Sequence, residues 1–286
     1  MAKNTFIRRK FLATSGAVAS LNIVKSGTLF GAENSALSKL SVGFIGMGGQ
    51  IQGHVNNLVN QGQHVAAFCD VDRSQIEKSM DRHKNHVKDC KPYEDYRNLL
   101  EKEKSLDAVV IATPDHWHAP ICKAAMAAGK HVYCEKPLTH TIKEARELRD
   151  LSKASNVVTQ TGNQGSASAN LRRSMELIEA GVFGPIREIH VWHPKHNWPS
   201  GGVRPAGSDP VPEGLNWDFW CGPAPVRPYK QGIYHPVKWR GWYDFGNGFI
   251  GDFCCHSFNL ALRSLHLDYP KRISFTGEGF GTETFA

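Results

Sequence analysis

The stretch from residue 40 to residue 160 constrains the fold more than any other part of this chain. Short β-branched runs alternate there with segments whose apolar residues recur at helical spacing. This alternation is typical of βαβ units, which build a parallel sheet covered by helices. Strands are expected at 41–45, 64–69, 108–112, 131–134 and 157–160, and helices at 50–60, 75–84, 93–102, 120–128 and 143–153. We therefore predict an α/β fold, with a doubly wound domain over residues 33–161.

A second domain, residues 162–286, is indicated by the change of pattern after Gly162. A helix is expected at 169–180, and strands at 185–192 and 272–276. Residues 194–244 are rich in Pro, Gly and Trp and far exceed an ordinary connection, so they form either a functional lid or a disordered insert. The six tryptophans from Trp192 to Trp242 argue against disorder.

Composition excludes several classes of protein. The chain has 286 residues, 41% hydrophobic and 21% charged, without a fibrous or disordered bias. The net charge of +7 is concentrated at the N-terminus, because residues 1–32 hold five basic residues and no acid. The rest carries about +2 and shows no basic patch interleaved with aromatic residues, so no nucleic-acid partner is expected.

The N-terminus resembles a twin-arginine export signal. Arg8, Arg9 and Lys10 precede a modestly apolar stretch of small residues that runs to about Leu29. We predict a signal segment over residues 1–32, the twin-arginine machinery as a partner, and a periplasmic or otherwise exported protein. The alternative is a basic, frayed tail. Polar residues interrupt the stretch, which is too polar for a stable membrane span.

The seven cysteines are interpreted as buried thiols. They are odd in number and form no Cys-x-x-Cys pair, which disfavours a disulfide framework or a zinc site. No metal is therefore predicted.

A glycine-rich turn follows the first expected strand. Gly46, Gly48 and Gly49 match the first part of a dinucleotide fingerprint, in which a helix N-terminus meets the pyrophosphate. The third glycine position is Ile51, although nearby Gly53 could relieve crowding. Asp70 ends the next strand, where a carboxylate accepts the ribose hydroxyls of NAD and repels the 2′-phosphate of NADP. NAD is thus favoured over NADP, with Arg73 as the residue that weakens this preference.

Two further motifs follow expected strands at the edge where ligands bind in such sheets. Thr113 and Pro114 open the first, which continues to His118. Its two histidines, His116 and His118, could be a metal pair, but no third ligand stands at a recognisable spacing. In the second, Glu135-Lys136-Pro137, the lysine is placed to reach both nicotinamide and substrate. The alternative for Lys136 is an ordinary salt bridge.

A third motif lies in the second domain. A glycine turn at 246–251 leads into an expected helix on which Asp252 and His256 share one face, at i and i+4. This spacing suits a carboxylate that orients an imidazole, and such an imidazole is a suitable base for a hydroxyl proton. In isolation, a helix-start Asp and a packed His are equally compatible with the pattern.

Together these motifs resemble the Gfo/Idh/MocA family, named for glucose-fructose oxidoreductase and inositol dehydrogenase. The set comprises Gly46-x-Gly48-Gly49, Asp70, Thr113-Pro114-Asp115-x-x-His118, Glu135-Lys136-Pro137, Gly162-Asn163-Gln164 and Asp252-x-x-x-His256. The resemblance runs from about Ser41 to the C-terminus. The region around Trp217–Pro225 and Trp239–Trp242 is similar to an exported bacterial subgroup of that family.

The resemblance implies a cofactor site, a catalytic group and a second domain. Lys136 and His256 would serve proton transfer, and Asp252 would help to place the substrate and His256. The implied cofactor-binding residues are Gly46, Gly48, Gly49, Asp70, Thr113, Pro114, His118, Glu135, Lys136 and Gln164. The second domain would be α/β, with a mainly antiparallel sheet through which a homo-oligomer could form. Because the chain offers two clear strand candidates there, we expect a truncated sheet with an exposed edge and uncovered apolar surface.

The tryptophan-rich region suits a carbohydrate site, because aromatic faces pack against sugar C–H bonds. Tryptophans anchor long loops equally well, and both interpretations stand. The predicted substrate contacts are His193, Lys195, Tyr234 and Arg240. Asn259 stands where many relatives have an acidic residue, which affects the expected substrate contacts.

The predicted function is NAD-dependent oxidation of a secondary hydroxyl of a sugar or cyclitol. One alternative is a redox-neutral glycoside hydrolase or lyase, in which a transient ketone permits elimination and is then reduced. Another is a sugar-binding protein with a vestigial cofactor site. If the chain is exported folded, its NAD would be carried with it, which predicts tight retention and a redox cycle closed on one bound cofactor.

Overall fold

The computed structural model describes residues 39–192, 198–268, 270–276 and 281–285. Residues 40–286 form one compact unit. The predicted signal segment, residues 1–32, and the predicted substrate contacts His193 and Lys195 lie outside the described residues. Within the described part, no helix is long and apolar enough to cross a membrane.

The predicted parallel sheet is confirmed and has six strands. They are β1 (Ser41–Ile45), β2 (His64–Cys69), β3 (Lys91–Tyr93), β4 (Ala108–Ile111), β5 (His131–Glu135) and β6 (Thr159–Gly162). All neighbours are parallel, in the order β3-β2-β1-β4-β5-β6. The order reverses between β1 and β4, where Ile45 pairs with Ile111, and such a switch point leaves a crevice at the carboxyl ends of the strands.

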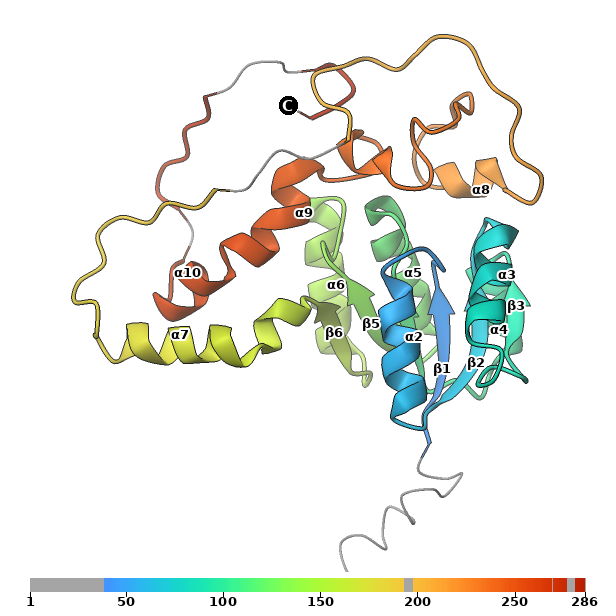
Figure 1. Cartoon of the computed structure of the whole chain (residues 1–286), viewed down its shortest axis with the longest axis horizontal. Helices are drawn as coiled ribbons and strands as arrows, with labels where there is room; N and C mark the ends of the chain where they lie inside the picture. Colours follow the sequence, from blue (N-terminus) through green and yellow to red (C-terminus); the bar gives the residue numbers. More distant parts are fainter. Residues whose placement is uncertain (1–38, 193–197, 269, 277–280, 286) are drawn as a thin grey trace, which may run out of the picture. The chain divides into compact units, whose positions relative to one another are not determined.

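The five predicted helices of this domain are present (Figure 1). They are α2 (Ile51–Asn60), α3 (Arg73–Arg82), α4 (Tyr96–Lys102), α5 (Asp115–Ala127) and α6 (Ile142–Ala154). Helix α5 begins five residues before the predicted position, because Pro114 rather than Pro120 precedes its first turn. Strand β3 was not predicted. It is three residues long and contains Pro92, which an edge strand tolerates.

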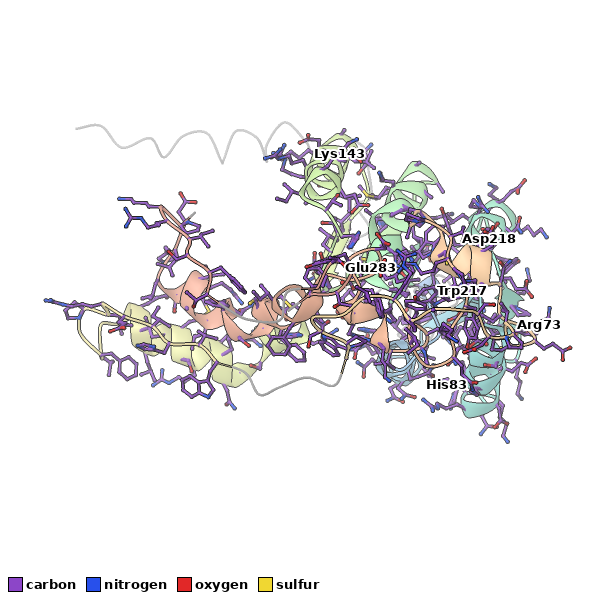
Figure 2. All side chains as sticks on the ribbon, turned by 90° about the horizontal axis from the view of Figure 1, so that it is seen from above. Arg73, His83, Lys143, Trp217, Asp218 and Glu283 are labelled. Atoms are coloured by element: carbon purple, nitrogen blue, oxygen red, sulfur yellow. The ribbon has the colours of Figure 1, made fainter. Side chains whose placement is uncertain are left out.

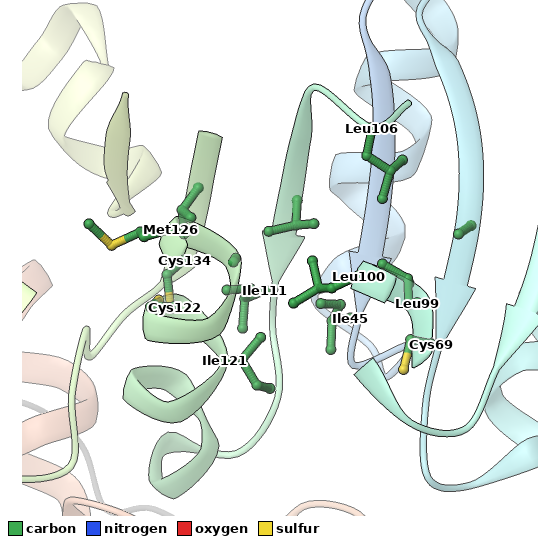
Figure 3. Close-up of a cluster of buried hydrophobic side chains, with 14 of the residues drawn as sticks. Ile45, Cys69, Leu99, Leu100, Leu106, Ile111, Ile121, Cys122, Met126 and Cys134 are labelled. Carbon is green, nitrogen blue, oxygen red and sulfur yellow. The ribbon is translucent and has the colours of Figure 1, made fainter. Parts of the chain in front are cut away.

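Alternating residues of β1 divide the core into two layers. Val42 and Phe44 pack against α2 and α3 on one face, in a cluster with Ile51 and Ile76. Ile45 points to the opposite face, where α4, α5 and α6 pack (Figure 3). Because both faces are covered, the strands lack the polar alternation of a solvated sheet. The covered sheet holds the strand ends, and the groups that follow them, in fixed positions.

The second half is described as helices and irregular backbone. Its elements are η2 (Gln164–Ala167), α7 (Ala169–Glu179), α8 (Trp217–Cys221), η3 (Lys238–Gly241), α9 (Gly248–Ser257) and α10 (Asn259–Ser264). The predicted helix at 169–180 is confirmed as α7. The strand predictions at 185–192 and 272–276 are wrong, because neither segment has, within the described residues, a neighbouring strand with which to pair its backbone groups.

Consequently no antiparallel sheet, and no exposed edge of one, is found after Gly162 in the described residues. Oligomerisation through such a sheet stays a prediction, because the described residues contain no sheet of this kind. The predicted uncovered apolar surface is present, and its members include Phe183, Trp192, Ile273 and Phe275, each more than 60% exposed.

The tryptophan-rich region is ordered around an aromatic cluster. Trp217 stacks on Trp220 with ring centroids 4.7 Å apart, and the other aromatic members of the cluster are Tyr229, Tyr234, Trp239, Trp242 and Phe245. The segment is joined to the carboxyl end of β2, where the amide of Arg73 donates to Gly214 and that of Asn216 to Val71. Figure 2 shows Trp217 on the same side as Arg73 of α3. The described part of this region, residues 198–244, is therefore not a disordered insert.

Candidate functional site

A cavity of about 810 Å³ opens at the carboxyl ends of the parallel strands. The glycine loop after β1, the start of α5, the residues after β5, helix α9 and parts of the tryptophan-rich region form its walls. It lies at the switch point of the sheet, the position at which α/β folds bind nucleotides, and its size is that of a ligand site.

The glycine loop turns sharply beneath this cavity. Gly46 has φ +88°, and a Cβ atom on it would lie 2.7 Å from the carbonyl carbon of Ala112 and from the amide nitrogen of Thr113. Cβ atoms on Gly48 and Gly49 would meet nothing within 4 Å, so these residues leave open space on the cavity wall. The expected role of Gly53 is wrong, because a Cβ atom there also meets nothing within 4 Å.

Asp70 joins the loop to the end of β2. Its carboxylate accepts hydrogen bonds from the amides of Met47, at 2.6 Å, and Asp72, at 2.9 Å, and it lines the cavity. Burial raises the pKa of Asp70 to about 6. Nearby, Arg73 forms an ion pair with Glu94 at 2.7 Å. Since Glu94 also lines the cavity, acidic groups occupy this end and the arginine is already paired.

Replacement of Asp70 by Asn is expected to weaken NAD binding about tenfold, because the negative charge is removed. The ratio of the protein's affinity for NAD to its affinity for NADP should fall for the same reason. Titration of both nucleotides against each protein measures this. Asp218→Asn, at an exposed position, serves as the control. An unchanged ratio of the two affinities would show that Asp70 does not select the cofactor.

The residues after β4 line the cavity next to the glycine loop. The hydroxyl of Thr113 is buried and has no hydrogen-bond partner among the described residues. His118 is buried, with its ring nitrogens 2.6 Å from the carbonyl oxygen of Pro137 and 2.9 Å from that of Thr113. The ring nitrogens of His116 lie 3.1 Å from the carbonyl oxygen of Phe245 and 3.0 Å from that of Trp220, so both histidines of this motif contact backbone carbonyls. The described residues contain no group of three or more His, Cys, Asp or Glu placed to hold a metal.

Glu135 lines the cavity and has two side-chain partners. Its Oε1 lies 2.6 Å from Nε2 of His54 on α2, and it also accepts a hydrogen bond from Gln164. These contacts lower the pKa of Glu135 against the opposing effect of burial. Gly162 permits this packing, since a Cβ atom there would lie 2.8 Å from Oε1 of Glu135. Glu135 and Gln164 line the cavity and also join its walls.

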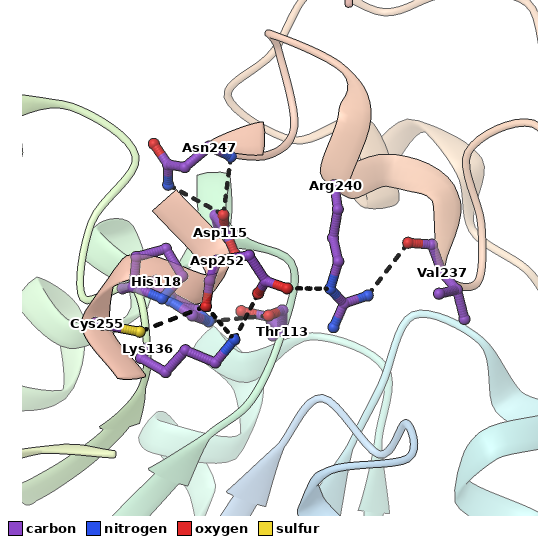
Figure 4. A network of polar contacts seen from close by, with 10 residues as sticks. Thr113, Asp115, His118, Lys136, Val237, Arg240, Asn247, Asp252 and Cys255 are labelled. Carbon is purple, nitrogen blue, oxygen red and sulfur yellow. Dashed lines mark hydrogen bonds and ion pairs between the residues drawn. The ribbon is translucent and has the colours of Figure 1, made fainter. Parts of the chain in front are cut away.

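Two of the three predicted catalytic residues, Lys136 and Asp252, contact each other in the structure (Figure 4). Nζ of Lys136 lies 2.5 Å from Oδ1 of Asp252, and it donates to the carbonyl oxygen of Asp252 at 3.0 Å. Arg240 approaches the other carboxylate oxygen, with Nε 3.6 Å away. His256 lines the same cavity one helical turn further along α9. Asp252 therefore lies between two cations.

The imidazole ring of His256 makes no hydrogen bond within the described part of the chain. The expectation that Asp252 orients its ring is wrong here, because the carboxylate is engaged by Lys136 and Arg240. Burial first, and then the charge of Lys136, lower the pKa of His256. The imidazole is therefore neutral at neutral pH and available as a base.

Of the predicted substrate contacts that the structure describes, one lines the cavity and one does not. Arg240 lines the cavity, and its guanidinium carbon lies 4.2 Å from the centroid of the Trp239 ring. Tyr234 is 1% exposed inside the aromatic cluster and does not line the cavity, so this prediction is wrong. Its flat apolar ring is more favourably buried against Trp242. Asn259 contacts Ser166 at 2.7 Å rather than the cavity.

Sequence reasoning missed several residues of the cavity wall. Trp198 and Phe253 stack with ring centroids 5.9 Å apart, and both line it. His235 also lines it and lies 2.9 Å from the Asp72 carboxylate. The tryptophan content indicated a binding surface, but it could not show which tryptophans line the cavity and which are buried in the aromatic cluster. Trp198, Trp220 and Trp239 line the cavity, whereas Trp217 and Trp242 belong to the cluster alone.

The buried carboxyl of Asp115 gives a testable pH dependence. Burial raises its pKa from 3.8 to about 7. Between about pH 4 and pH 7 the folded protein therefore holds a proton that the unfolded chain has released, and stability falls as pH rises through this window.

Asp115→Asn removes that dependence. The loss of unfolding free energy between about pH 4 and pH 7 should be smaller in the variant by roughly 3 to 4 kcal/mol. Urea denaturation at both pH values measures it. The neighbouring His116, whose pKa burial lowers to about 4, is common to both proteins and cancels in the difference. Parallel pH profiles would contradict the raised pKa.

The strand order and the glycine loop define a Rossmann-type dinucleotide-binding protein, with a second segment over the cavity. Two consecutive domain models of one family match the chain. The oxidoreductase family NAD-binding Rossmann fold matches residues 40–163, and the oxidoreductase family C-terminal alpha/beta domain matches residues 169–268. The chain belongs to the Gfo/Idh/MocA oxidoreductase family. The predicted family and its NAD-binding domain are thereby confirmed.

Individual relatives match parts of the chain. An alpha-N-acetylgalactosaminidase of Tannerella forsythia is 31% identical over 155 residues, which are 51% of this chain and 33% of that protein. A glycosyl hydrolase family 109 protein of Shewanella putrefaciens is 28% identical over 209 residues, 63% of this chain and 44% of that protein. The matches thus span less than half the length of these curated relatives.

Solved structures match with similar coverage. The myo-inositol 2-dehydrogenase of Lactobacillus plantarum is 28% identical, with a TM-score of 0.47, over 52% of this chain and 43% of that one. An NAD-binding protein from Listeria innocua is 28% identical, with a TM-score of 0.45, over 51% of this chain and 42% of that one.

Proposed function

We propose that this protein oxidises a secondary hydroxyl of a sugar or cyclitol with NAD. The observation that carries the proposal is that Lys136, Asp252 and His256 line the same cavity as Gly48 and Asp70. A proton-transfer group and a dinucleotide loop thus face one space. Membership of an NAD-binding oxidoreductase family supports the same reaction class.

The residues present fit NAD. The open wall at Gly48 and Gly49 leaves room for a pyrophosphate beside the N-terminus of α2, and Asp70 stands where ribose hydroxyls bind. Thr113, whose buried hydroxyl has no partner among the described residues, also lines the cavity. NAD, when bound, supplies the hydride acceptor.

The protein's own groups would handle the proton. His256, neutral because burial and Lys136 lower its pKa, accepts the proton of the substrate hydroxyl. Lys136, held by Asp252, donates a hydrogen bond to the same oxygen and stabilises its developing negative charge. Trp198, Trp239 and Arg240 supply aromatic faces and a cation for the ring and hydroxyls of a polyol.

The test is incubation of the purified protein with NAD and a panel of hexoses, cyclitols and their acids, one polyol at a time. We expect stoichiometric NADH from at least one of them. Lys136→Ala protein, assayed in parallel, should form none. If tight NAD binding is accompanied by no NADH from any polyol, net oxidation is wrong.

A redox-neutral glycoside hydrolase or lyase is the second candidate. It is favoured by the names of the matching relatives, an alpha-N-acetylgalactosaminidase and a glycosyl hydrolase family 109 protein. Release of the aglycone from an aryl N-acetylgalactosaminide without net NADH would support it over the first candidate. A non-catalytic sugar-binding protein would bind a sugar equally well before and after Lys136→Ala and show neither reaction.

Export by the twin-arginine route is proposed from the Arg8-Arg9 segment. A protein exported folded would carry NAD from the cytoplasm, so we propose that it retains the cofactor and closes its redox cycle on it. The test is to express the chain with residues 1–32, isolate it from the periplasm without added nucleotide, and quantify bound NAD. Folded protein without NAD, or retention in the cytoplasm, would contradict this.

A further inference from the structure

Asp115, the first residue of α5, makes a buried contact with the second segment that the proposed chemistry does not use. Its Oδ2 accepts two hydrogen bonds from Asn247, one from the backbone amide and one from the side-chain Nδ2, each 3.0 Å long. Asp115 is 2% exposed. Figure 4 shows this pair beside Asp252 and Lys136. Asp115 also directly follows Thr113 and Pro114 of the cavity wall.

Asn247 is the N-cap residue of α9, the helix that carries Asp252 and His256. An asparagine at this position normally caps its own helix by accepting from a backbone amide of the first turn. Here the side chain makes no such bond. Its Nδ2 donates instead to Asp115 and to the carbonyl oxygen of Thr139, at 3.1 Å. The start of α9 is thus held by the Rossmann domain rather than by its own cap.

The two residues before Asn247 are held in the same way. The carbonyl oxygen of Phe245 accepts from the amide of His116 and lies 3.1 Å from Nδ1 of the same residue. The carbonyl oxygen of Gly246 lies 3.1 Å from Nε2 of His140. Three consecutive residues therefore each contact a side chain of the NAD-binding domain. Of these three residues, Asn247, the partner of Asp115, is nearest to α9 in sequence.

We propose that Asp115 is a positioning residue that, through Asn247, fixes α9 and its Asp252 and His256 relative to the cofactor loop Thr113–Pro114. The catalytic consequence rests on the proposed function, but the positioning does not. A nucleotide that orders the loop would also order α9, because the loop continues directly into Asp115. Without the Asp115 carboxylate, a nucleotide would still order the loop but would no longer order α9.

Amide hydrogen exchange followed by mass spectrometry tests this without turnover. In the parent protein, NAD should slow exchange in residues 248–257. In Asp115→Ala, exchange there should be about tenfold faster, the effect of losing hydrogen bonds to a buried carboxylate, and NAD should no longer slow it. Exchange in α2 should stay unchanged, and the affinity for NAD should change less than about threefold.

Asp72→Ala is the matched control, because Asp72 is also a buried carboxylate that contacts the second segment, through His235. It should leave exchange in residues 248–257 unchanged. The exchanged pair D115N/N247D, in which an amide and a carboxylate again face each other, should restore part of the protection. If Asp115→Ala does not fold, Asn247→Ala, which removes the side-chain donor to Asp115, provides the comparison.

Unchanged exchange in α9 of Asp115→Ala and Asn247→Ala, or an equal increase in Asp72→Ala, would overturn the proposal. Failure of the proposed oxidation would be recognised separately, as NAD-dependent protection of α9 without NADH from any polyol. Where a polyol is oxidised, Asp115→Ala should lower kcat and leave KM for NAD near its parent value, a division that general destabilisation would not produce.

Discussion

Replacement of His256 by alanine is expected to lower the turnover of the polyol that the protein oxidises by about 100-fold or more, the usual contribution of a general base. The affinity for NAD should remain within about threefold, because the imidazole contributes to proton transfer rather than to the glycine loop. Steady-state kinetics and nucleotide titration measure the two effects. His86→Ala, which removes an exposed imidazole on the surface, should change neither.

The same assignment predicts a pH profile. Because burial and Lys136 lower the pKa of His256, kcat/KM for the polyol should fall on the acidic side with a pKa below the ordinary imidazole value, as the ring gains its proton. This acidic limb should be absent from the residual activity of His256→Ala. A turnover equal to that of the parent protein would leave His256 a packing role on α9, and Lys136 would become the remaining candidate for the base.

Alanine substitutions in the glycine loop should separate folding from cofactor binding. Gly46→Ala is expected to lower the free energy of unfolding by about 3 kcal/mol, because a Cβ atom at φ +88° would collide with the backbone of Ala112 and Thr113. Gly48→Ala should fold normally, since its Cβ atom meets nothing, but bind NAD at least about tenfold more weakly, because the methyl group enters the space of the pyrophosphate.

Gly53→Ala is the control within the same segment. Its Cβ atom has open space on α2 and does not line the cavity, so both stability and NAD binding should be retained or slightly improved. Urea denaturation and nucleotide titration cover all three variants. Equal NAD affinity in Gly48→Ala and the parent protein would place the pyrophosphate elsewhere than on this loop.

Local sequence determined the NAD-binding half of the protein. The predicted strands at 41–45 and 64–69 match β1 and β2 in their bounds, because apolar residues on both faces of a covered sheet produce an unbroken run bounded by polar turns. The glycine loop, Asp70 and Lys136 were found for a related reason. Each directly follows a strand, and the ends of parallel strands meet at one edge of the sheet.

The second half was decided by tertiary contacts. Two runs resembled strands but have no strand partner in the part of the chain that the structure describes, and a strand without a neighbour cannot satisfy its backbone groups. Tyr234 and Arg240 were equally good substrate contacts by composition, yet Tyr234 lies in the aromatic cluster and Arg240 on the cavity wall. The i, i+4 spacing placed Asp252 and His256 on one face, but it did not reveal that two distant cations engage the carboxylate.

The sequence by itself therefore determined the family, the parallel sheet and the identity of the groups at its edge, since periodicity and short motifs are local properties. Only the tertiary structure decided which of these groups touch. Asp115 and Asn247 are 132 residues apart, and neither periodicity nor motif spacing reports a contact over such a separation. Whether a side chain supports a wall or faces the cavity depends on the packing of segments that the chain brings together only on folding.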